Sequence, residues 1–464
     1  MSSDPRLLHA RRRFLKHGGL AAGAMLAMGP VGRLLAQAGA PAATHPGFGP
    51  IRPVRDLTTG LPLLELPEGF SYLSFGWAGE PLPGDQRTPD KHDGMGIVRA
   101  DGDVLTLVRN HEITAGYGSF APPSATYDGP CAGGTVTLRF DARAGKLLDA
   151  RPSLSGTLVN CSGGTTPWGT WLSCEEIVSA AGTVGLANVD CELAHDHGFV
   201  FEVPAEGMSN AQPLRAMGQF RHEAATVDPR SGIVYMTEDH DPDAGFYRFV
   251  PAKNGELQRG GRLQMLRAKG APDLRAGHRS GARFAVEWVE IEHPERGVGG
   301  SDGMSGVVEQ GLANGGSKFT RLEGCIAGDG VVYFTATNGG DAACGQVWAY
   351  HPDEEQLHLL YQSHDPAVLD YPDNIVISPR GGLVVCQDSE GHDQHLYGLT
   401  TDGALFTFAR NVTQLSGEQG FAGDYSDSEW AGSCFSPDGR WLFANLQEPG
   451  YSVAITGPWR QGLI

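Results

Sequence analysis

The chain has 464 residues, 66 of them glycine and 30 proline, and its 54 acidic and 35 basic residues give a formal net charge of −19. This acidic balance gives nucleic acids and anionic membranes no electrostatic reason to bind the protein. Eight cysteines in so long a chain are not the disulfide framework of a small secreted domain, and their spacing alone does not pair them.

The first 38 residues predict an export signal. A basic run from Arg11 to Lys16 precedes a short, glycine-rich apolar stretch and an Ala36-Gln37-Ala38 cleavage motif. The paired arginines are typical of the twin-arginine route, and an amphipathic N-terminal helix is the alternative. The apolar stretch is too short to span a membrane. We therefore expect the twin-arginine translocase to deliver a soluble monomer, residues 39–464, to the periplasm or the medium.

Short β-rich runs separated by glycine, Asp-Gly and proline turns occupy the rest of the chain, and helical patterns are scarce. Such runs predict antiparallel hairpins. A single core rarely grows beyond about 250–300 residues, so a chain of this length forms either two domains or one closed repeat. The predicted strands and hairpins lie at 96–110, 134–148, 198–207, 232–241, 245–257, 330–340, 346–362, 381–388, 395–411 and 435–447.

Polar residues stand at matching places in six of these units. In each unit the first strand carries one polar residue near its start, and the return strand ends on another. The interval is 14–16 residues in five units and 19 in the first, which brings the chain back to the same end of the sheet. The pairs are Asp93 and Glu112, Cys161 and Glu175, Glu223 and Glu238, Glu323 and Asn338, Asp373 and Asp388, and Glu429 and Asn445.

This sixfold repeat predicts an all-β fold, a six-bladed β-propeller in which residues 39–464 form one domain. The first strand of every propeller blade lines the central channel, so the polar residues would meet at one mouth of that channel. The alternative is a set of ordinary turn acids on a solvated rim. Residues 266–318 interrupt the repeat between its third and fourth units, either as an insertion over the channel face or as a plain surface excursion.

The converging residues favour a metal site. Carboxylates gathered near one axis need cations to neutralise them, and together with neighbouring asparagines they suit Ca²⁺. Cys161 is a soft ligand that calcium does not use, so it indicates a nucleophile or a transition metal such as iron; a buried, small apolar role is the alternative. The acids that would gather there are Glu112, Glu175, Glu176, Glu223, Glu238, Asp239, Glu323, Asp373, Asp388 and Glu429.

Arg321 stands two residues before Glu323, and residues at this spacing on a strand share a face. Its guanidinium would either bind a substrate anion bidentately or form an ion pair with one of the acids. Strand alternation turns the histidines that adjoin candidate acids away from the shared face, which favours packing roles; these are His111, His222 and His240. The His-Asp-His-Gly stretch at 195–198 could bind zinc, but no partner lies near it in the sequence, and this interpretation is disfavoured.

Four stretches of this chain together resemble the PhoX alkaline phosphatases of bacteria: the signal, 110–112, 160–176 and 221–225. The resemblance extends from about residue 60 to the end. It implies a six-bladed propeller that binds Fe(III) and Ca²⁺ at the channel mouth and hydrolyses phosphate esters. By motif, it implies that Cys161, Glu223 and Glu323 are iron ligands and that Arg321 binds the substrate phosphate. The implied calcium-ligand candidates are Glu112, Glu175, Glu238, Asp373 and Glu429.

The implied reaction is metal-assisted, in-line hydrolysis of a small-molecule phosphate ester, with Cys161 and Arg321 as catalytic residues. One departure is local: typical members carry Arg-Pro-Glu-Trp where residues 321–324 of this chain read Arg-Leu-Glu-Gly. Two other classes compete. A calcium-only propeller hydrolase of the lactonase or phosphotriesterase type has no use for a thiolate, and a non-catalytic periplasmic binding propeller does not need so many inward acids.

Overall fold

The computed structural model describes residues 47–114, 118–184, 192–300, 305–389, 393–400, 404–461 and 463–464. The predicted export signal, residues 1–38, lies outside the described residues. Among those residues, no helix is both long and apolar enough to cross a lipid bilayer. The helical segments are α3 (Gly306–Ala313) and the short 3₁₀ turns η1 (Pro123–Ala125), η3 (Arg215–Met217), η4 (Leu257–Arg259) and η5 (Glu418–Gly420).

Antiparallel sheets make up the fold, as the sequence predicts. The first two sheets contain β6 (His92–Asp101), β7 (Val104–His111), β8 (Gly133–Asp141) and β9 (Lys146–Thr157), then β10 (Asn160–Thr165), β11 (Thr170–Glu175) and β12 (Val200–Pro204). A nine-stranded sheet contains, in bonded order, β13 (His222–Val227), β14 (Val234–Glu238), β15 (Phe246–Pro251), β16 (Gly261–Ala268), β17 (Arg283–Glu290), β21 (Gln356–Gln362), β20 (Gln346–His351), β19 (Val331–Ala336) and β18 (Leu322–Gly328).

The remaining strands form two larger sheets and two small hairpins. The larger sheets are, in bonded order, β22 (Pro372–Ile377), β23 (Leu383–Gln387), β24 (His395–Leu399), β25 (Leu405–Asn411), β2 (Leu64–Pro67) and β1 (Ile51–Val54), and β28 (Trp430–Phe435), β29 (Leu442–Leu446), β30 (Tyr451–Thr456) and β3 (Ser71–Phe75). The hairpins are β4 (Pro81–Leu82) with β5 (Gln86–Arg87), and β26 (Gln414–Ser416) with β27 (Ala422–Asp424).

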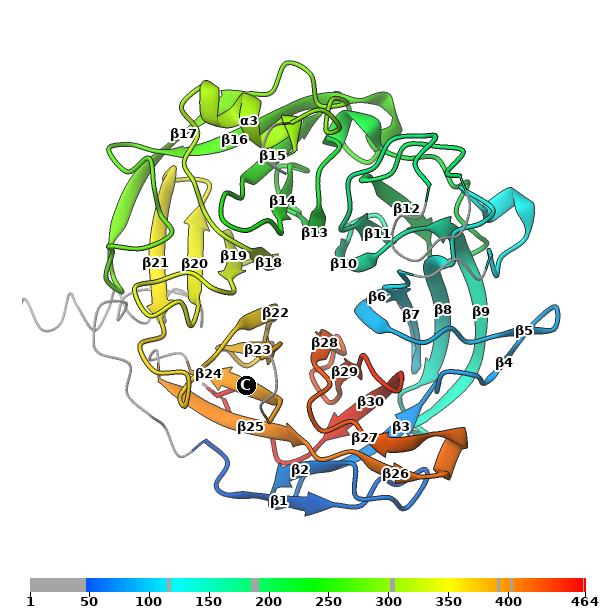
Figure 1. The fold of residues 1–464 in the computed structure, drawn as a ribbon. Coiled ribbons are helices and arrows are strands. Elements are labelled where there is room, and N and C mark those ends of the chain that lie inside the picture. The colour runs from blue at the N-terminus through cyan, green and yellow to red at the C-terminus, as the bar shows by residue number, and fades with distance from the viewer. Residues whose placement is uncertain are drawn as a thin grey trace, which may run out of the picture.

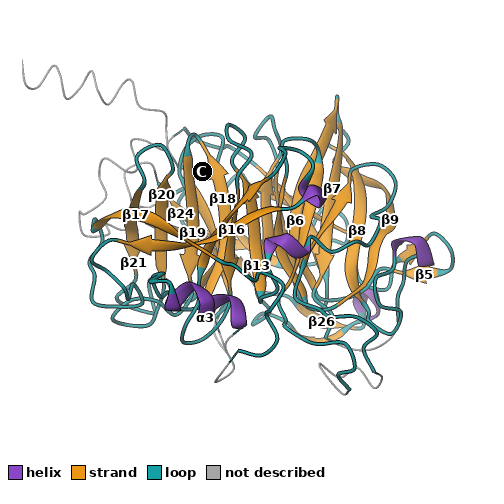
Figure 2. Ribbon diagram, turned by 90° about the horizontal axis from the view of Figure 1, so that it is seen from above, coloured by secondary structure: helices purple, strands orange, loops and turns teal. Residues whose placement is uncertain are grey.

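The sheets stand in a ring around a central axis, and their innermost strands line it (Figure 1). Going round the ring, each innermost strand contacts the next, and the last contacts the first. The strands run between two loop-covered faces, and α3 lies on one of them (Figure 2). The innermost strands, in ring order, are β6, β10, β13, β18, β22 and β28.

Two pairings tie the N-terminal part of the chain to its C-terminal part. β3 adds to the outer edge of the C-terminal sheet, where Ser71 pairs with Thr456 and Phe75 with Ser452. β2 pairs with β25, which extends another sheet outwards. Because these contacts join residues far apart in sequence, the ring closes only when both ends of the chain are in place.

Part of the segment 266–318 builds the outer wall of the ring. β17 lies within it and pairs with β16 on one side and β21 on the other, so it fuses two neighbouring sheets at their outer edges. The start of α3 turns back towards the axis, because Ser305 caps this helix and also donates a hydrogen bond to Glu238 (2.8 Å). The segment therefore contributes both to the periphery and to the region beside the channel.

Apolar side chains fill the spaces between adjacent sheets. The largest fully buried groups include Trp348, Trp430 and Tyr247. Phe246 of β15 and Phe334 of β19, from the two halves of the nine-stranded sheet, stack with their ring centroids 4.1 Å apart. This packing surrounds the channel and holds the innermost strands in position, which is what places the polar residues described next.

Candidate metal centre at the channel mouth

A β-bulge occurs near the start of every innermost strand. In β10 the ladder pairs Asn160 with Glu175 and then shifts register before Gly163. Corresponding shifts lie between residues 92 and 95, 222 and 225, 322 and 325, 372 and 375, and 431 and 434. A bulge bends its strand and re-aims a side chain. The residues that open these bulges in the first five strands are Asp93, Cys161, Glu223, Glu323 and Asp373.

The bulge residues and their neighbours gather into three contiguous groups. Within each group the possible ligand atoms all lie within 4.8 Å of one another. The thiol of Cys161 also contacts a member of a second group, since its Sγ lies 3.6 Å from Asp93 Oδ2. The groups are Glu112, Cys161 and Glu176; Asp93, Glu112 and Glu429; and Glu223, Glu323 and Asp373.

The structure brings together six of the eight residues predicted as metal ligands: Cys161, Glu223, Glu323, Glu112, Asp373 and Glu429. It places Glu175 and Glu238 elsewhere. Glu175 accepts hydrogen bonds from the backbone N–H groups of Leu158 (2.9 Å) and Gly198 (2.8 Å). Glu238 accepts from Tyr247 (2.6 Å) and Ser305 (2.8 Å).

The reason for this difference is the register of the ladder. Glu175 and Glu238 pair across the strand with the residue before each bulge, so they share its orientation and turn into the sheet. The following residues face the channel mouth instead. They are Glu176, which joins the Cys161 group, and Asp239, which contacts Arg321.

Burial and mutual repulsion dominate the electrostatics of the cluster. Burial, and then the neighbouring carboxylates, hold the pKa of several acids well above the ordinary range; these are Asp93, Glu176, Glu223, Glu323, Asp373 and Glu429. Burial likewise raises the pKa of Glu112 to about 7 and that of the Cys161 thiol well above its usual value. So many buried acids are stable in ionised form only when cations neutralise them.

The donor set fits bound cations. The Oε2 atom of Glu223 is buried and finds no hydrogen-bond partner among the described residues, which is costly for a carboxylate unless an ion occupies the space beside it. Gln447, which sequence analysis did not single out, places its amide nitrogen 2.6 Å from Glu112 Oε2 and within reach of Asp93 and Glu429. The carboxylates suit hard cations such as Ca²⁺, and the thiol of Cys161 suits a transition metal.

Basic side chains border the acids on one side. Arg321 Nε lies 3.1 Å from Asp239 Oδ1, and its Nη2 lies 2.9 Å from Glu323 Oε1. These contacts leave Nη1 without a hydrogen-bond partner among the described residues. Arg221, which the sequence analysis also did not identify, lies close to Glu176 and Glu238. It lowers the pKa of both acids, but burial has the larger, opposite effect. The strip of positive charge beside the cations is suited to an anionic substrate.

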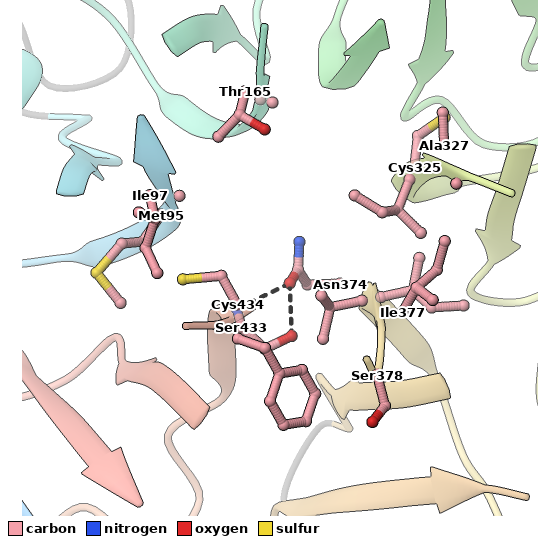
Figure 3. A pocket seen from close by; sticks show the side chains of 18 of the residues that line it. Met95, Ile97, Thr165, Cys325, Ala327, Asn374, Ile377, Ser378, Ser433 and Cys434 are labelled. Carbon is pink, nitrogen blue, oxygen red and sulfur yellow. Dashed lines mark hydrogen bonds between the residues drawn. The ribbon is translucent and has the colours of Figure 1, made fainter. Parts of the chain in front are cut away.

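Beyond the acids, the channel opens into a cavity of about 490 Å³ lined by the later parts of the innermost strands. Figure 3 shows apolar and sulfur-containing side chains around it, among them Met95, Ile97 and Cys434. Asn374 accepts hydrogen bonds from the N–H (3.0 Å) and hydroxyl (3.1 Å) of Ser433. This cavity holds no group of the clustered acids, so the chemistry resides at the mouth.

The neighbouring acids Glu175 and Glu176 test this assignment. Glu176→Gln is expected to weaken metal binding at the mouth by more than about tenfold. Loss of a residue that only orients a metal ligand typically lowers metal affinity by about 10–100-fold, and loss of a direct ligand should cost at least as much. Glu175→Gln is expected to lower the free energy of unfolding by about 1–3 kcal/mol, because buried donors lose their acceptor, while metal binding at the mouth is retained. Metal analysis and thermal unfolding of both variants check this; loss of mouth metals from Glu175→Gln alone would reverse the assignment.

We compared the chain with known sequences, solved structures and protein families. A search of curated proteins found no similar sequence. Among solved structures, a gluconolactonase from Xanthomonas campestris is 12% identical with a TM-score of 0.43, over 91% of this chain and 99% of that one. A putative TolB from Agrobacterium tumefaciens is 10% identical with a TM-score of 0.37, over 81% and 92% of the two chains. At these scores neither likeness supports a functional inference.

The family comparison is more specific. The model of the family described as alkaline phosphatase PhoX matches residues 46–128 and 123–450. These matches include every member of the acid and thiol cluster and extend over most of the chain. The chain therefore belongs to the alkaline phosphatase PhoX family, whose members are metal-dependent phosphoric ester hydrolases.

Proposed function

We propose that this protein is a six-bladed β-propeller that hydrolyses small phosphate esters with Fe(III) and Ca²⁺ bound at the channel mouth. The observation that carries the proposal is the convergence of buried carboxylates and one thiol, each opening a bulge of an innermost strand, on a single mouth. The closed ring of contacts between innermost strands supports the six blades.

We assign the iron ligands by the family resemblance and their chemistry. Cys161, Glu223 and Glu323 would hold iron, because the set combines a soft thiolate with carboxylates. These three residues come from two of the groups at the mouth. The oxygen-only positions would hold calcium, and they are Asp93, Glu112, Glu176, Asp373 and Glu429. Glu176 takes the place first assigned to Glu175, and Asp239, which pairs with Arg321, stands where Glu238 was expected.

When bound, the cations supply charge neutralisation of phosphoryl oxygens and a lowered pKa for water. The protein supplies the rest of the site. Arg321 would turn its free Nη1, and on substrate binding its other N–H groups, towards two phosphoryl oxygens. The buried position of the acids lowers the local dielectric and strengthens the attraction of the site for an anionic transition state.

The remaining assignments concern where the protein works. We propose export by the twin-arginine translocase, removal of residues 1–38 and function in the periplasm or medium as a monomer of residues 39–464. Support comes from the paired arginines and the Ala-Gln-Ala motif. Within the proposed single domain, residues 266–318 are an insertion between the third and fourth blades. The hydrogen bond from Ser305 to Glu238 ties the end of this insertion to β14.

The test uses protein purified from the periplasm of an exporting host without chelator. Iron and calcium are quantified per chain, and hydrolysis of p-nitrophenyl phosphate is compared with hydrolysis of a simple lactone. Iron and calcium at more than one ion each, with phosphatase activity lost on chelation and restored by both metals, is the expected result. Calcium without iron, together with lactone hydrolysis, would contradict the proposal and place the protein in the lactonase-like class.

A further inference from the structure

We propose a second metal site, of structural type, built from Asp128, Cys131 and His197 and suited to Zn²⁺ or a similar transition-metal ion. The residues come from the connection between β7 and β8 and from the connection between β11 and β12. Their possible ligand atoms all lie within 4.8 Å of one another, in a group separate from those of the channel mouth. Asp128 is 1% exposed, and Cys131 and His197 are fully buried.

The distances within the group are those of ligands around one ion. His197 Nε2 lies 3.9 Å from Cys131 Sγ and 3.5 Å from Asp128 Oδ2. Ligand atoms on one tetrahedral zinc stand roughly 3.3–3.6 Å apart, given bonds of about 2.0 Å to nitrogen or oxygen and about 2.3 Å to sulfur. The two distances from His197 Nε2 are within a few tenths of an ångström of this range, and the third pair lies within 4.8 Å, so small side-chain shifts would bring the three atoms around one ion. The fourth position is left to water or to the second oxygen of Asp128.

His197 is held in the orientation that a metal ligand requires. Its Nδ1 lies 2.6 Å from Glu175 Oε1, so the ring donates from Nδ1 and directs Nε2 towards Asp128 and Cys131. Histidine ligands usually donate their other N–H to a carboxylate in this way, which fixes the tautomer and raises the basicity of the ligand. Glu175 is itself fixed by backbone N–H groups of Leu158, Gly198 and Phe199.

An unsatisfied oxygen points independently to a bound cation. Asp128 Oδ2 accepts hydrogen bonds from the N–H groups of Ala194 (2.8 Å) and His195 (3.2 Å). Its Oδ1 is buried and has no hydrogen-bond partner within the part of the chain that the structure describes. Buried carboxylate oxygens are rarely left without a partner, and a cation beside Asp128 supplies one.

The ligand types favour zinc over calcium, and the burial of the group favours a structural role over a catalytic one. Zinc accepts a thiolate, an imidazole and a carboxylate together, whereas calcium would use only the carboxylate of this set. The group is closed off from solvent, whereas a catalytic zinc keeps a position open to substrate. The two connections that it joins, residues 112–132 and 176–199, are long, and a metal clasp would fix them against each other. The alternative without an ion is a protonated His197 between the carboxylates of Glu175 and Asp128, beside a neutral Cys131 thiol.

The first experiment measures zinc in the full-length exported protein and its variants. Wild type is expected to contain about one zinc per chain that resists dialysis, as tightly bound structural zinc does. Cys131→Ser and His197→Gln are expected to lose it and to unfold at lower temperature. Cys344→Ser is the matched control, because Cys344 is also buried and free but lies in none of the metal-type groups. Zinc content that Cys131→Ser leaves unchanged, or its absence from wild type grown with zinc, would overturn the proposal.

A second experiment tests the site if the Cys131 or His197 variants fail to fold. It also distinguishes metal bound here from metal bound at the channel mouth. The Cys161→Ser protein, which lacks the thiol of the mouth, is stripped of metal and reconstituted with Co²⁺ alone. A thiolate-to-cobalt charge-transfer band is expected, because Cys131 still binds the ion, and adding Cys344→Ser to this variant should leave the band in place. A cobalt spectrum of Cys161→Ser without a thiolate band would overturn the second site, whatever the outcome of the phosphatase assays.

Discussion

Replacing Cys161 by alanine is expected to abolish phosphatase activity and to release iron, while the chain still folds. Cys161 opens the bulge in β10 and contributes the one thiol among the clustered acids of the mouth. Burial holds its pKa well above the usual value, so the thiol is neutral without metal and becomes a thiolate only when a cation takes the place of its proton. Removing it leaves iron with oxygen ligands only.

The expected loss is large because the cations supply most of the transition-state stabilisation. A metal Lewis acid is worth several kcal/mol, which corresponds to roughly 10³-fold or more in rate. The measurement pairs kcat/KM for p-nitrophenyl phosphate with iron content and far-ultraviolet circular dichroism of the same preparation. Cys434→Ala is the matched control, since Cys434 lines the same channel on the cavity side, away from the acids.

The control should keep both iron and activity. Full activity in Cys161→Ala with unchanged iron would show that the thiol is a packing group and would remove the argument for a transition metal at the mouth. Loss of iron with activity retained on calcium alone would favour a calcium-only hydrolase. Each outcome is distinct from misfolding, which circular dichroism reports directly.

The residues on the innermost strands could be predicted from sequence because each stands at the same place in its hairpin. Cys161, Glu223, Glu323 and Asp373 all follow the first ladder pair of their strands. A run of hairpins with matching polar residues specifies such a placement without knowledge of any distance. The same regularity predicts the all-β architecture, which local patterns of turn and strand residues largely determine.

The residues of the return strands that face the mouth could not be predicted from spacing, because residue spacing does not reveal a β-bulge. An extra residue in one strand shifts every later position by one, and a shift by one exchanges the two faces of a strand. This is why Glu175 and Glu238 turn into the sheet while Glu176 and Asp239 reach the mouth. The partners of Glu175 include His197, far along the chain, and no local pattern announces that contact.

The departure from the family motif after Glu323 has a packing reason. A Cβ atom on Gly324 would lie 2.6 Å from the backbone nitrogen of Ile375 and 2.7 Å from the Cα of Asn374. β18 and β22 therefore approach too closely for any side chain at this position, and a tryptophan there would require the two strands to separate. The narrow approach also brings Glu323 and Asp373 into one group.

The second large expected effect comes from replacing Arg321, and it concerns binding of the substrate phosphate rather than binding of metal. Its Nε and Nη2 contact Asp239 and Glu323, and the side chain is 28% exposed, so it stands at the boundary between the buried acids and solvent. Burial is the largest single influence and lowers the pKa of the guanidinium, but the flanking carboxylates together outweigh it and raise the pKa, so the group stays charged. Once its other N–H groups turn from these carboxylates, the planar guanidinium can bind two phosphoryl oxygens in one plane.

Arg321→Lys and Arg321→Gln are therefore expected to lower kcat/KM for a phosphate ester by about 10²-fold or more, with the iron content per chain largely kept. Each charge-assisted hydrogen bond contributes about 1.5–3 kcal/mol, and lysine cannot make two in the same plane. Inhibition by inorganic phosphate should weaken in parallel, because product and substrate share the contact.

Arg410→Lys is the matched control, because Arg410 is similarly exposed and also bridges two carboxylates, Glu65 and Asp393, far from the channel. It should change neither kcat/KM nor phosphate inhibition. If Arg321→Lys retains both as well, Arg321 is a structural ion pair that holds Asp239 and Glu323 in place. Weakened inhibition by phosphate in an iron-replete variant has no such structural explanation, and would identify the guanidinium as the group that recognises the phosphoryl oxygens.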